Sequence, residues 1–401
     1  MAHAYAVTDR QVRWYRLAVH HLDHLYPASC LEAVAGVCGL QNSPPGAWET
    51  AAFARLADCS VFRLQTALEQ EKALLQAWSY RGAPVVFPAA ESPVFLSALA
   101  ARPGEEPWIY TRGITLALDY LGISWEQALD LVCWTVACLD TRTVQSKEEL
   151  DRVLAAEAAP LLPPSLREKW NAPSLYGRPD RQTVGGAVVS FALRPCAFLG
   201  QVVFGNRQGI SPTFTSYTRW LGQPLPPEPE AEPKLVRKFL HAYGPATSAD
   251  LGAWLGSSPR QTKRLWQTVA GELIPVEKAG KRAYLLAQDL PALAGAQPPR
   301  TSLVLVGPHD PYLDARDRSL LLENTTLQCQ VWRTVTNPAV ILRDGQVAGI
   351  WKPRTRGKQL EITLEPFGPL AAAERQQLTH RAEAYAAFRG LHLRSLTCTE
   401  P

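Results

Sequence analysis

Three adjacent side chains that can hold a water molecule interrupt an apolar stretch, "VCGLQNSPPG", at residues 37–46. The amide oxygens of Gln41 and Asn42 accept hydrogen bonds, and the Ser43 hydroxyl does the same with a shorter reach. None of the three is a base at neutral pH, so they can orient a water molecule but cannot take its proton. The segment therefore predicts a water-positioning site, with Gln41, Ser43 and Asn42 as candidate catalytic residues.

A structural interpretation explains the same residues. Ser43 stands directly before Pro44 and Pro45. A serine there is a favourable helix N-cap, and Pro44 suits the first helical position. The run Asn-Ser-Pro-Pro-Gly is also ordinary turn chemistry. From the residues alone, both interpretations stay open.

Basic side chains gather in four other places, where arginine or lysine can pair with phosphate. The candidates for DNA contact are Arg81 and Gly82 in "WSYRGAP", Asn206 and Arg207 beside Gln208 in "GNRQG", Arg260, Lys263 and Arg264 in "RQTKRLW", and Lys352, Arg354, Arg356 and Lys358 in "WKPRTRGK". The last set is the densest basic patch of the chain. The alternatives are a buried ion pair for Arg81 and a solvated helix face or turn for the others.

Two further groups suggest a metal site or acid–base chemistry. They are His309, Asp310, Asp314, Arg316, Asp317 and Arg318 in "PHDPYLDARDR", and His20, His21 and His24 in "HHLDH". The interleaved arginines favour an internal ion-pair network that ties this segment to a neighbouring domain. His20 and His24 would share one helical face, which is either a metal pair or a partly exposed helix surface. No spacing requires a metal, and we expect neither a metal nor a cofactor.

The elements that must carry these side chains recur as helices followed by a strand pair. The clearest unit, at 234–298, contains the amphipathic helix "EPKLVRKFLHAYG", a short helix capped by Ser248 and ended by Gly256, and a third helix capped by Ser257 or Ser258. A hairpin turning at "KAGKR" follows. Three helices and a hairpin are the order of a winged helix, whose last helix can enter a major groove.

The remaining segments complete an α+β chain. After residue 298, "TSLVLVG", "QCQVWRTV", "AVILRDGQVAGIWKP" and "QLEITLEPF" have strand-like patterns, and "PLAAAERQQLTHRAEAYAAFRG" is helical. The expected organisation is 1–122 winged-helix unit 1, 123–222 winged-helix unit 2, 223–233 Pro/Glu-rich linker, 234–298 winged-helix unit 3, 299–368 β-barrel-like domain, and 369–401 C-terminal helix and tail.

The composition limits the classes of protein to which this chain can belong. The 401 residues are 46% hydrophobic and 19% charged, which indicates folded domains and excludes a disordered chain. No apolar run is long enough for a bilayer, and the first residues contain no signal-peptide core. Eight scattered cysteines without a CxxC pair indicate buried, reduced thiols. We therefore expect a soluble, intracellular protein; a net charge of +4 does not by itself establish a nucleic-acid partner.

The blocks "PTFTSYTRWLG", "LVRKFLHAYGPATSADLGAWLG", "PHDPYLDARDR" and "PAVILRDGQVAGIWKPR", together with "WSYRGAP", resemble successive segments of the AlkZ/YcaQ-like winged-helix DNA glycosylases. The resemblance covers nearly the whole chain in order. It implies tandem winged-helix units and a β-barrel in a C-shaped arrangement curved around DNA. It also implies release of bulky or crosslinking alkyl adducts of purines, which protects some antibiotic producers from their own genotoxin.

The resemblance places the catalytic segment on "GLQNSPP". The family pattern reads Gln-apolar-Gln or Gln-apolar-Asp. Gln41 matches its first position, Asn42 replaces the apolar residue, and Ser43 replaces the second Gln or the Asp. The retained chemistry therefore suits only activated, cationic lesions.

The expected function is that of a monofunctional DNA glycosylase, a hydrolase of the N-glycosidic bond of bulky or crosslinked alkylpurines in duplex DNA. It would act in repair of alkylation damage and in genotoxin resistance, as a cytoplasmic, nucleoid-associated monomer without a membrane partner. Two alternatives remain open because of the Gln-Asn-Ser segment. One is a non-catalytic winged-helix DNA-binding protein, such as a lesion sensor or transcription factor. The other is a protein that sequesters the genotoxin itself.

Overall fold

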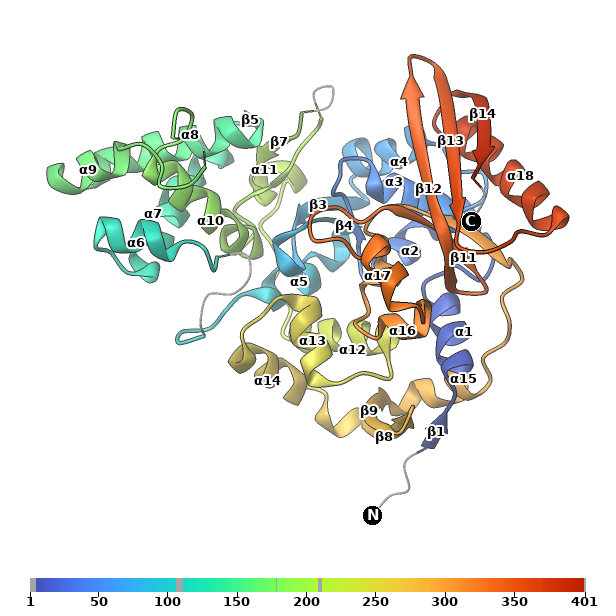
Figure 1. Ribbon diagram of the computed structural model, residues 1–401. Coiled ribbons are helices and arrows are strands. Elements are labelled where there is room, and N and C mark those ends of the chain that lie inside the picture. The colour runs from blue at the N-terminus through green and yellow to red at the C-terminus, as the bar shows by residue number, and fades with distance from the viewer. Residues whose placement is uncertain (1–4, 106–110, 178, 208–210, 400–401) are drawn as a thin grey trace.

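A computed structural model describes residues 5–105, 111–177, 179–207 and 211–399 of the chain (Figure 1). Helices and strands are mixed, and the strands of these residues form four separate sheets. The predicted α+β class is therefore confirmed. None of the helices in the described ranges combines the length and apolar character that a bilayer crossing requires.

The first unit lies at the centre of the molecule and forms the helices and hairpin expected for it (Figure 1). Thr8 caps its first helix through a complete capping box with Gln11. The helices are α1 (Asp9–Val19), α2 (Leu31–Gly36), α3 (Ala47–Arg55), α4 (Val61–Gln65) with a π-helical extension (Thr66–Gln70), and α5 (Ser92–Phe95). Strands β3 (Leu74–Trp78) and β4 (Pro84–Pro88) form the hairpin, and β2 (Leu40–Gln41) pairs with the other edge of β4.

The middle unit forms a lobe beside the first (Figure 1). Its helices are α6 (Thr115–Leu121), α7 (Trp125–Val136), α8 (Lys147–Ala158), α9 (Pro164–Asn171), α10 (Val184–Phe198) and α11 (Tyr217–Leu221). Helix α6 was expected in the first unit, but its apolar residues pack in the core of this lobe. A small sheet of β5 (Val144–Gln145), β7 (Thr213–Thr215) and β6 (Val203–Phe204) closes it. Apolar faces of α7, α8 and α10 meet around the fully buried Trp170, which gives this lobe a core of its own.

The third unit has the predicted element order. Its helices are α12 (Ala231–Tyr243), α13 (Ser248–Leu255) and α14 (Pro259–Gln267), followed by the hairpin β8 (Leu273–Lys278) and β9 (Lys281–Leu286) and the short α15 (Leu290–Ala294). Ser258 caps α14 and Gly256 ends α13 in a left-handed conformation, as expected. Thr247 caps α13, so the prediction of Ser248 is wrong by one residue. Strand β1 (Tyr5–Val7) adds to the hairpin alongside β8.

The C-terminal region is an open sheet, so the predicted β-barrel is wrong. Its strands β10 (Leu303–Val306), β11 (Ala339–Arg343), β12 (Gln346–Arg356), β13 (Gln359–Pro366) and β14 (His392–Cys398) pair in that order, and β10 and β14 remain edges in the described chain. Helix α18 (Ala372–Phe388) connects β13 to β14, which pair in parallel. A parallel connection needs such a crossover on one face of the sheet. The residues expected to be a tail therefore form an edge strand.

Two short helices lie between β10 and β11, α16 (Arg318–Leu321) and α17 (Thr325–Val331). The segment "QCQVWRTV", interpreted as a strand from its composition, forms the end of α17 and the loop after it. Asn324 accepts hydrogen bonds from two amides of this helix and thereby fixes its start.

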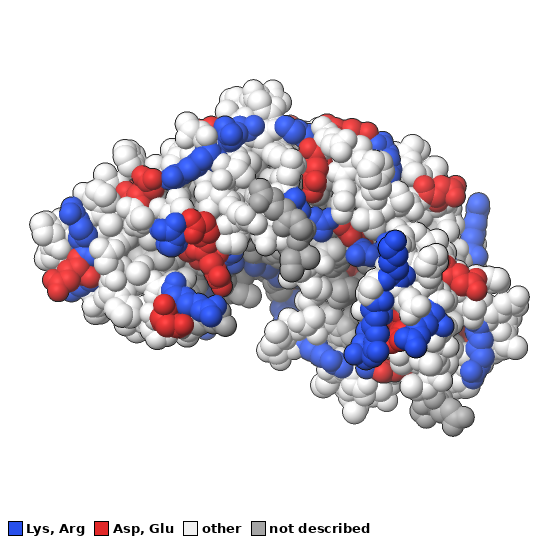
Figure 2. Space-filling model, turned by 90° about the horizontal axis from the view of Figure 1, so that it is seen from above, with Lys and Arg blue, Asp and Glu red and all other residues white. Residues whose placement is uncertain are grey.

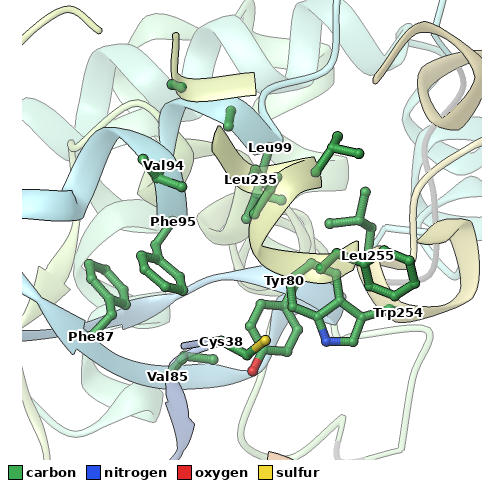
Figure 3. Packing of buried hydrophobic residues seen from close by; sticks show 14 of the residues in the cluster. Cys38, Tyr80, Val85, Phe87, Val94, Phe95, Leu99, Leu235, Trp254 and Leu255 are labelled. Atoms are coloured by element: carbon green, nitrogen blue, oxygen red, sulfur yellow. The ribbon is translucent and has the colours of Figure 1, made fainter. Parts of the chain in front are cut away.

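The first and third units share one buried apolar cluster (Figure 3). Tyr80 of the first unit stacks on Trp254 of α13, with ring centroids 4.5 Å apart. Val85 and Phe87 of β4 lie in the same cluster as Leu235 of α12. This shared core fixes the position of the turn at residues 80–82 relative to α13.

Ion pairs tie residues 309–318 to the other units, as the interleaved arginines predicted. Arg55 of α3 donates two hydrogen bonds of 2.8 Å to the two carboxylate oxygens of Asp310, with side-chain exposures of 1% and 0%. Asp317 binds Arg16 of α1 at 2.8 Å and also Lys278 of β8. The segment is thus fixed to α1, α3 and β8 at the same time.

The histidines of "HHLDH" do not share a helical face, because α1 ends at Val19 and His21 is left-handed, with φ of 56°. His20 is buried, and its Nε2 lies 3.2 Å from the carbonyl oxygen of Ala242. His24 pairs with Asp23 instead. In the described ranges, no group of three or more His, Cys, Asp and Glu side chains is arranged to hold a metal ion.

We expect Asp310→Ala to lower the free energy of unfolding by about 3–5 kcal/mol, because it leaves the buried Arg55 guanidinium without its counter-charge. Urea denaturation of both proteins measures this difference. Glu157→Gln is the matched control, since it removes an ion pair with Arg142 in which both side chains are at least 40% exposed. It should cost less than about 1 kcal/mol. Equal costs for the two variants would contradict the assignment of Arg55–Asp310 as the fixing contact.

Candidate functional site

A cavity of about 580 Å³ lies where the first unit, α13 and the C-terminal region meet. It is lined by Gln41, Arg81, Ala83, Ala253, His309, Leu313, Asp314, Ala315, Arg316, Arg318, Trp332 and Asn337. A neighbouring cavity of about 410 Å³ shares Asp314, Ala315 and Arg316 with it. Of the two, only the larger is lined by a residue of the predicted catalytic segment.

Strand β2 places Gln41 in this cavity. The strand pairs with β4, so that Gln41 lies opposite Val85 and Leu40 opposite Val86. Successive residues of a strand point to opposite faces. Leu40 accordingly packs in the core, and Gln41 lines the cavity with 9% of its surface exposed. Among the described residues its amide has no hydrogen-bond partner, so both polar atoms are available to a ligand.

Gly39 makes the turn that leads from α2 into this strand. It has φ of +74°, and a Cβ atom there would lie 2.3 Å from Cγ1 of Val85. A side chain at this position would therefore prevent β2 from pairing with β4. Helix α2 ends at Gly36 and the turn intervenes, so Gln41 lies in a strand and not at the end of the helix.

Asn42 does not line the cavity, and both polar atoms of its side chain have hydrogen-bond partners elsewhere. Its Nδ2 donates to Oε1 of Gln76 at 3.0 Å, and its Oδ1 accepts from the backbone amide of Gly46 at 2.7 Å. The side chain is 6% exposed, which agrees with a position where the family has an apolar residue. A buried amide needs such partners. The structure therefore does not bring Asn42 to the water-positioning site.

Ser43 is half-buried and does not line the cavity. The interpretation of Ser43 as a helix cap is also wrong. Helix α3 begins at Ala47, with Gly46 at its N-cap position, because the two prolines form a turn before the helix. In the described structure the Ser43 hydroxyl makes no hydrogen bond. Of the three candidate catalytic residues, only Gln41 lies at the cavity.

Arg81 forms the ion pair that was the alternative to DNA contact. Its Nη2 donates to Oδ2 of Asp314 at 2.7 Å, and both residues line the cavity. Arg81 is held left-handed, with φ of 55°, and Gly82 follows with φ of 66°. Burial raises the pKa of the Asp314 carboxyl, and the Arg81 charge opposes that shift. Burial lowers the pKa of the nearby His309, which favours its neutral form.

The helix predicted to enter a groove, α14, instead packs on residues 99–105. Arg260 donates to the carbonyl oxygen of Gly104 at 2.9 Å. Gln261 donates to that of Leu99 at 2.9 Å, and Arg264 binds Glu105 at 2.7 Å. Arg264 also pairs with Glu232. Arg264 is thus neutralised by internal carboxylates, whereas Arg260 and Lys263 are exposed, with Arg260 held only through a backbone carbonyl.

Arg207, the predicted wing cation, pairs with Glu49 of α3 at 2.9 Å. The backbone oxygen of the neighbouring Asn206 accepts a hydrogen bond from Thr213. The Arg207–Glu49 pair joins the middle unit to the first unit, and the Thr213–Asn206 hydrogen bond lies within the middle unit. Gln208 lies outside the described residues.

The basic patch on β12 and β13 is exposed, as predicted. Lys352 and Arg356 lie 2.5 Å and 3.7 Å from Glu365 and Glu361, respectively. Arg354 and Lys358 have no acidic partner among the described residues. Figure 2 shows the surface hollowed between two lobes, with Lys and Arg side chains gathered on the larger lobe beside the hollow. This patch is the predicted DNA contact that keeps the most unpaired charge.

Sequence reasoning missed two residues of the cavity wall, Trp332 and Asn337. The Arg318 guanidinium lies over the Trp332 ring, 5.3 Å from its centroid. The Asn337 backbone amide donates to Nε2 of His309 at 3.3 Å. Both residues follow α17; Trp332 lies in the segment interpreted as a strand and Asn337 lies just after it, so no pattern marked them.

A model of the family described as "DNA glycosylase AlkZ-like" matches residues 34–388. The chain therefore belongs to the AlkZ-like DNA glycosylase family, and the resemblance seen in its sequence blocks is confirmed. The chain is 25% identical over 405 residues to the interstrand DNA cross-link repair glycosylase of Streptomyces sahachiroi, a match covering 95% of this chain and 97% of that protein. The structure of Streptomyces sahachiroi DNA glycosylase AlkZ has the same fold, with a TM-score of 0.74 at 22% identity. It covers 98% of this chain and 100% of that one.

We expect the double variant Arg354→Ala/Arg356→Ala to weaken binding to undamaged duplex and to flatten its salt dependence. If each arginine neutralises one phosphate, the slope of log K against log salt falls by about two. Fluorescence anisotropy over a range of salt concentrations measures the slope.

The matched control is Arg260→Ala/Arg264→Ala, which removes the same charge from side chains that have internal partners. It should lower the melting temperature and leave the slope unchanged. An unchanged slope in the Arg354/Arg356 variant would place the basic patch outside the DNA path.

Proposed function

We propose that this glycosylase hydrolyses the N-glycosidic bond of bulky or crosslinked alkylpurines in duplex DNA, with Gln41 orienting the attacking water. The observation that carries the proposal is the unpaired Gln41 amide in the cavity wall. Its carbonyl oxygen accepts a hydrogen bond from water, which places the water oxygen for attack on the sugar. The similarity to the Streptomyces cross-link repair glycosylase supports the choice of lesion class.

The chemistry suits a site that lacks a strong general acid. A purine alkylated at N7 or N3 already carries positive charge and becomes neutral as it leaves. The sugar passes through an oxocarbenium-like transition state, as in other glycoside cleavage. A cavity of about 580 Å³ also has room for a base that carries a large adduct.

The DNA path we propose follows the basic patch on β12 and β13 to the cavity. Three winged-helix units in a C-shaped arrangement would enclose the duplex, with the third unit turned so that α14 supports residues 99–105 instead of entering a groove. Nucleoid DNA is then the partner of a cytoplasmic monomer, and the proposed hydrolysis requires no metal or cofactor.

Two observations favour a second candidate function. Asn42 is committed to internal hydrogen bonds, and Ser43 does not line the cavity. A protein that binds lesions without cleaving them, or that sequesters the genotoxin in the same cavity, would need no catalytic partner for Gln41. Incubation with an N7-alkylguanine duplex followed by alkali separates these functions. Strand breaks at the lesion indicate excision, and a gel shift without breaks indicates binding alone.

We expect Gln41→Ala to abolish measurable excision and leave the melting temperature unchanged, because the amide supports no other part of the fold. Loss of one preorganised hydrogen-bonding group should raise the barrier by about 2–4 kcal/mol. Single-turnover excision and thermal melts of both proteins measure the two effects. Ser43→Ala is the control, and it should excise at the wild-type rate because Ser43 does not line the cavity. Excision by Gln41→Ala at the wild-type rate would contradict the role of Gln41.

A further inference from the structure

We propose that Asp314 supplies the acceptor that the Gln-Asn-Ser segment lacks, so that its carboxylate holds and deprotonates the water oriented by Gln41. The proposal rests on the proposed function. It names a catalytic residue for the same site, taken from the C-terminal region and not from the segment where the family pattern places it. The family pattern has a Gln or an Asp where this chain has Ser43, and Ser43 does not line the cavity.

Asp314 and Gln41 line the same cavity from different parts of the chain. The Asp314 side chain is 11% exposed, and its Oδ2 accepts the hydrogen bond from Arg81. Its Oδ1 has no hydrogen-bond partner in the described ranges, so its full acceptor capacity is available to a ligand in the cavity. Oδ2 therefore fixes the side chain through Arg81, and Oδ1 can accept a hydrogen bond from water in the cavity.

In the other two aspartates of the segment, both carboxylate oxygens bind structural partners. Both oxygens of Asp310 bind the Arg55 guanidinium. The two oxygens of Asp317 bind Arg16 and Lys278 separately. His309 already accepts a hydrogen bond at Nε2 from the backbone amide of Asn337. Within this segment, Asp314 is the carboxylate that combines a place in the Gln41 cavity with a free oxygen.

The fold fixes Asp314 through its partner. Arg81 sits in a left-handed turn between β3 and β4, directly after Tyr80. Tyr80 is 1% exposed and packs on Trp254 in the core shared by the first and third units (Figure 3). Arg81 therefore has little freedom to leave the ion pair. A preorganised carboxylate is what a positioned general base requires.

The reaction balances without another reactant. The water oxygen forms a bond to C1′ as the bond from C1′ to purine N9 breaks. The electron pair of the broken bond goes to the base and neutralises its positive charge. One proton of the water passes to Oδ1 of Asp314, and solvent then removes it. The products are an abasic sugar with a hydroxyl at C1′ and the free alkylpurine.

The surroundings of Asp314 affect when it is ionised. The charged or titratable groups around it are Cys38, Tyr80, Arg81, Tyr243, His309 and Asp310, and Arg316 and Arg318 lie in the cavity wall. Burial raises the pKa of the carboxyl, and Arg81 acts in the opposite direction. A carboxylate with a raised pKa is a stronger base while it remains ionised. Excision should therefore slow as the pH falls through this raised pKa.

The test is single-turnover excision from a duplex that carries one N7-alkylguanine, with protein in excess. Asp314→Asn keeps the size of the side chain and removes its charge. We expect its rate to fall by about 100-fold or more, with DNA affinity unchanged. The acid limb of the wild-type pH profile should be absent from this variant. Added formate should restore part of the rate to Asp314→Ala, because a small carboxylate can occupy the space left by the side chain.

The matched control is Asp317→Asn, three residues further along the same segment. Asp317 is also ion-paired but does not line the Gln41 cavity. It should lower the melting temperature and leave excision at the wild-type rate. A loss of excision in this control equal to that in Asp314→Asn would overturn the proposal, since a general weakening of the segment would then explain both.

Two other outcomes separate this inference from the function on which it rests. Excision by Asp314→Asn at the wild-type rate, together with loss of excision by Gln41→Ala, overturns the role of Asp314 alone. If Asp314→Asn is too unstable to assay, absence of formate rescue in Asp314→Ala overturns that role. A wild-type protein that excises no cationic adduct, small or bulky, overturns the proposed function and this inference with it.

Discussion

The buried pair of Arg55 and Asp310 fixes the geometry on which the cavity depends. Both carboxylate oxygens bind one guanidinium, with almost no exposed surface on either side chain. Removing either partner would leave a buried charge without compensation, so the contact is costly to open. It fixes residues 309–318 against α3, which follows the Gln41 segment in the chain. The cavity exists because two segments distant in sequence are fixed there at a constant separation.

Asp310, Asp314 and Asp317 of that segment differ in the hydrogen-bond partner of their second carboxylate oxygen. In Asp310 it completes the fixing contact, and in Asp317 it reaches Lys278 of the third unit. In Asp314 it is left free at the cavity. The first two carboxylates give the segment rigidity, and rigidity is what allows the third to be held with one oxygen unpaired. Structural and chemical roles are thus divided among residues of the same type within one short stretch.

Local signals in the sequence predicted the local structure well. Thr247 and Ser258 cap helices, Gly256 ends one, and "KAGKR" turns a hairpin, all within one residue of expectation. Long-range partners could not be predicted in this way. Arg264 has the pattern of a groove-facing cation, but Glu105 and Glu232 neutralise it. The open sheet was missed for a similar reason, since only the return of α18 shows that β14 pairs with β13 in parallel.

The same limit applies to the site. Gln41 was identified because its chemistry is visible in its own segment, whereas the place of Asp314 in the same cavity depends on Arg81 and Arg55. Fold stability does not explain why a glutamine occupies position 41. The adjacent buried amide of Asn42 is satisfied by Gln76 and by the backbone of Gly46, but the Gln41 amide has no partner in the described structure. An apolar side chain at the same strand position would bury its surface without leaving polar groups unpaired. An amide there, facing a cavity that also contains a half-paired carboxylate, is better explained by a ligand that binds between them.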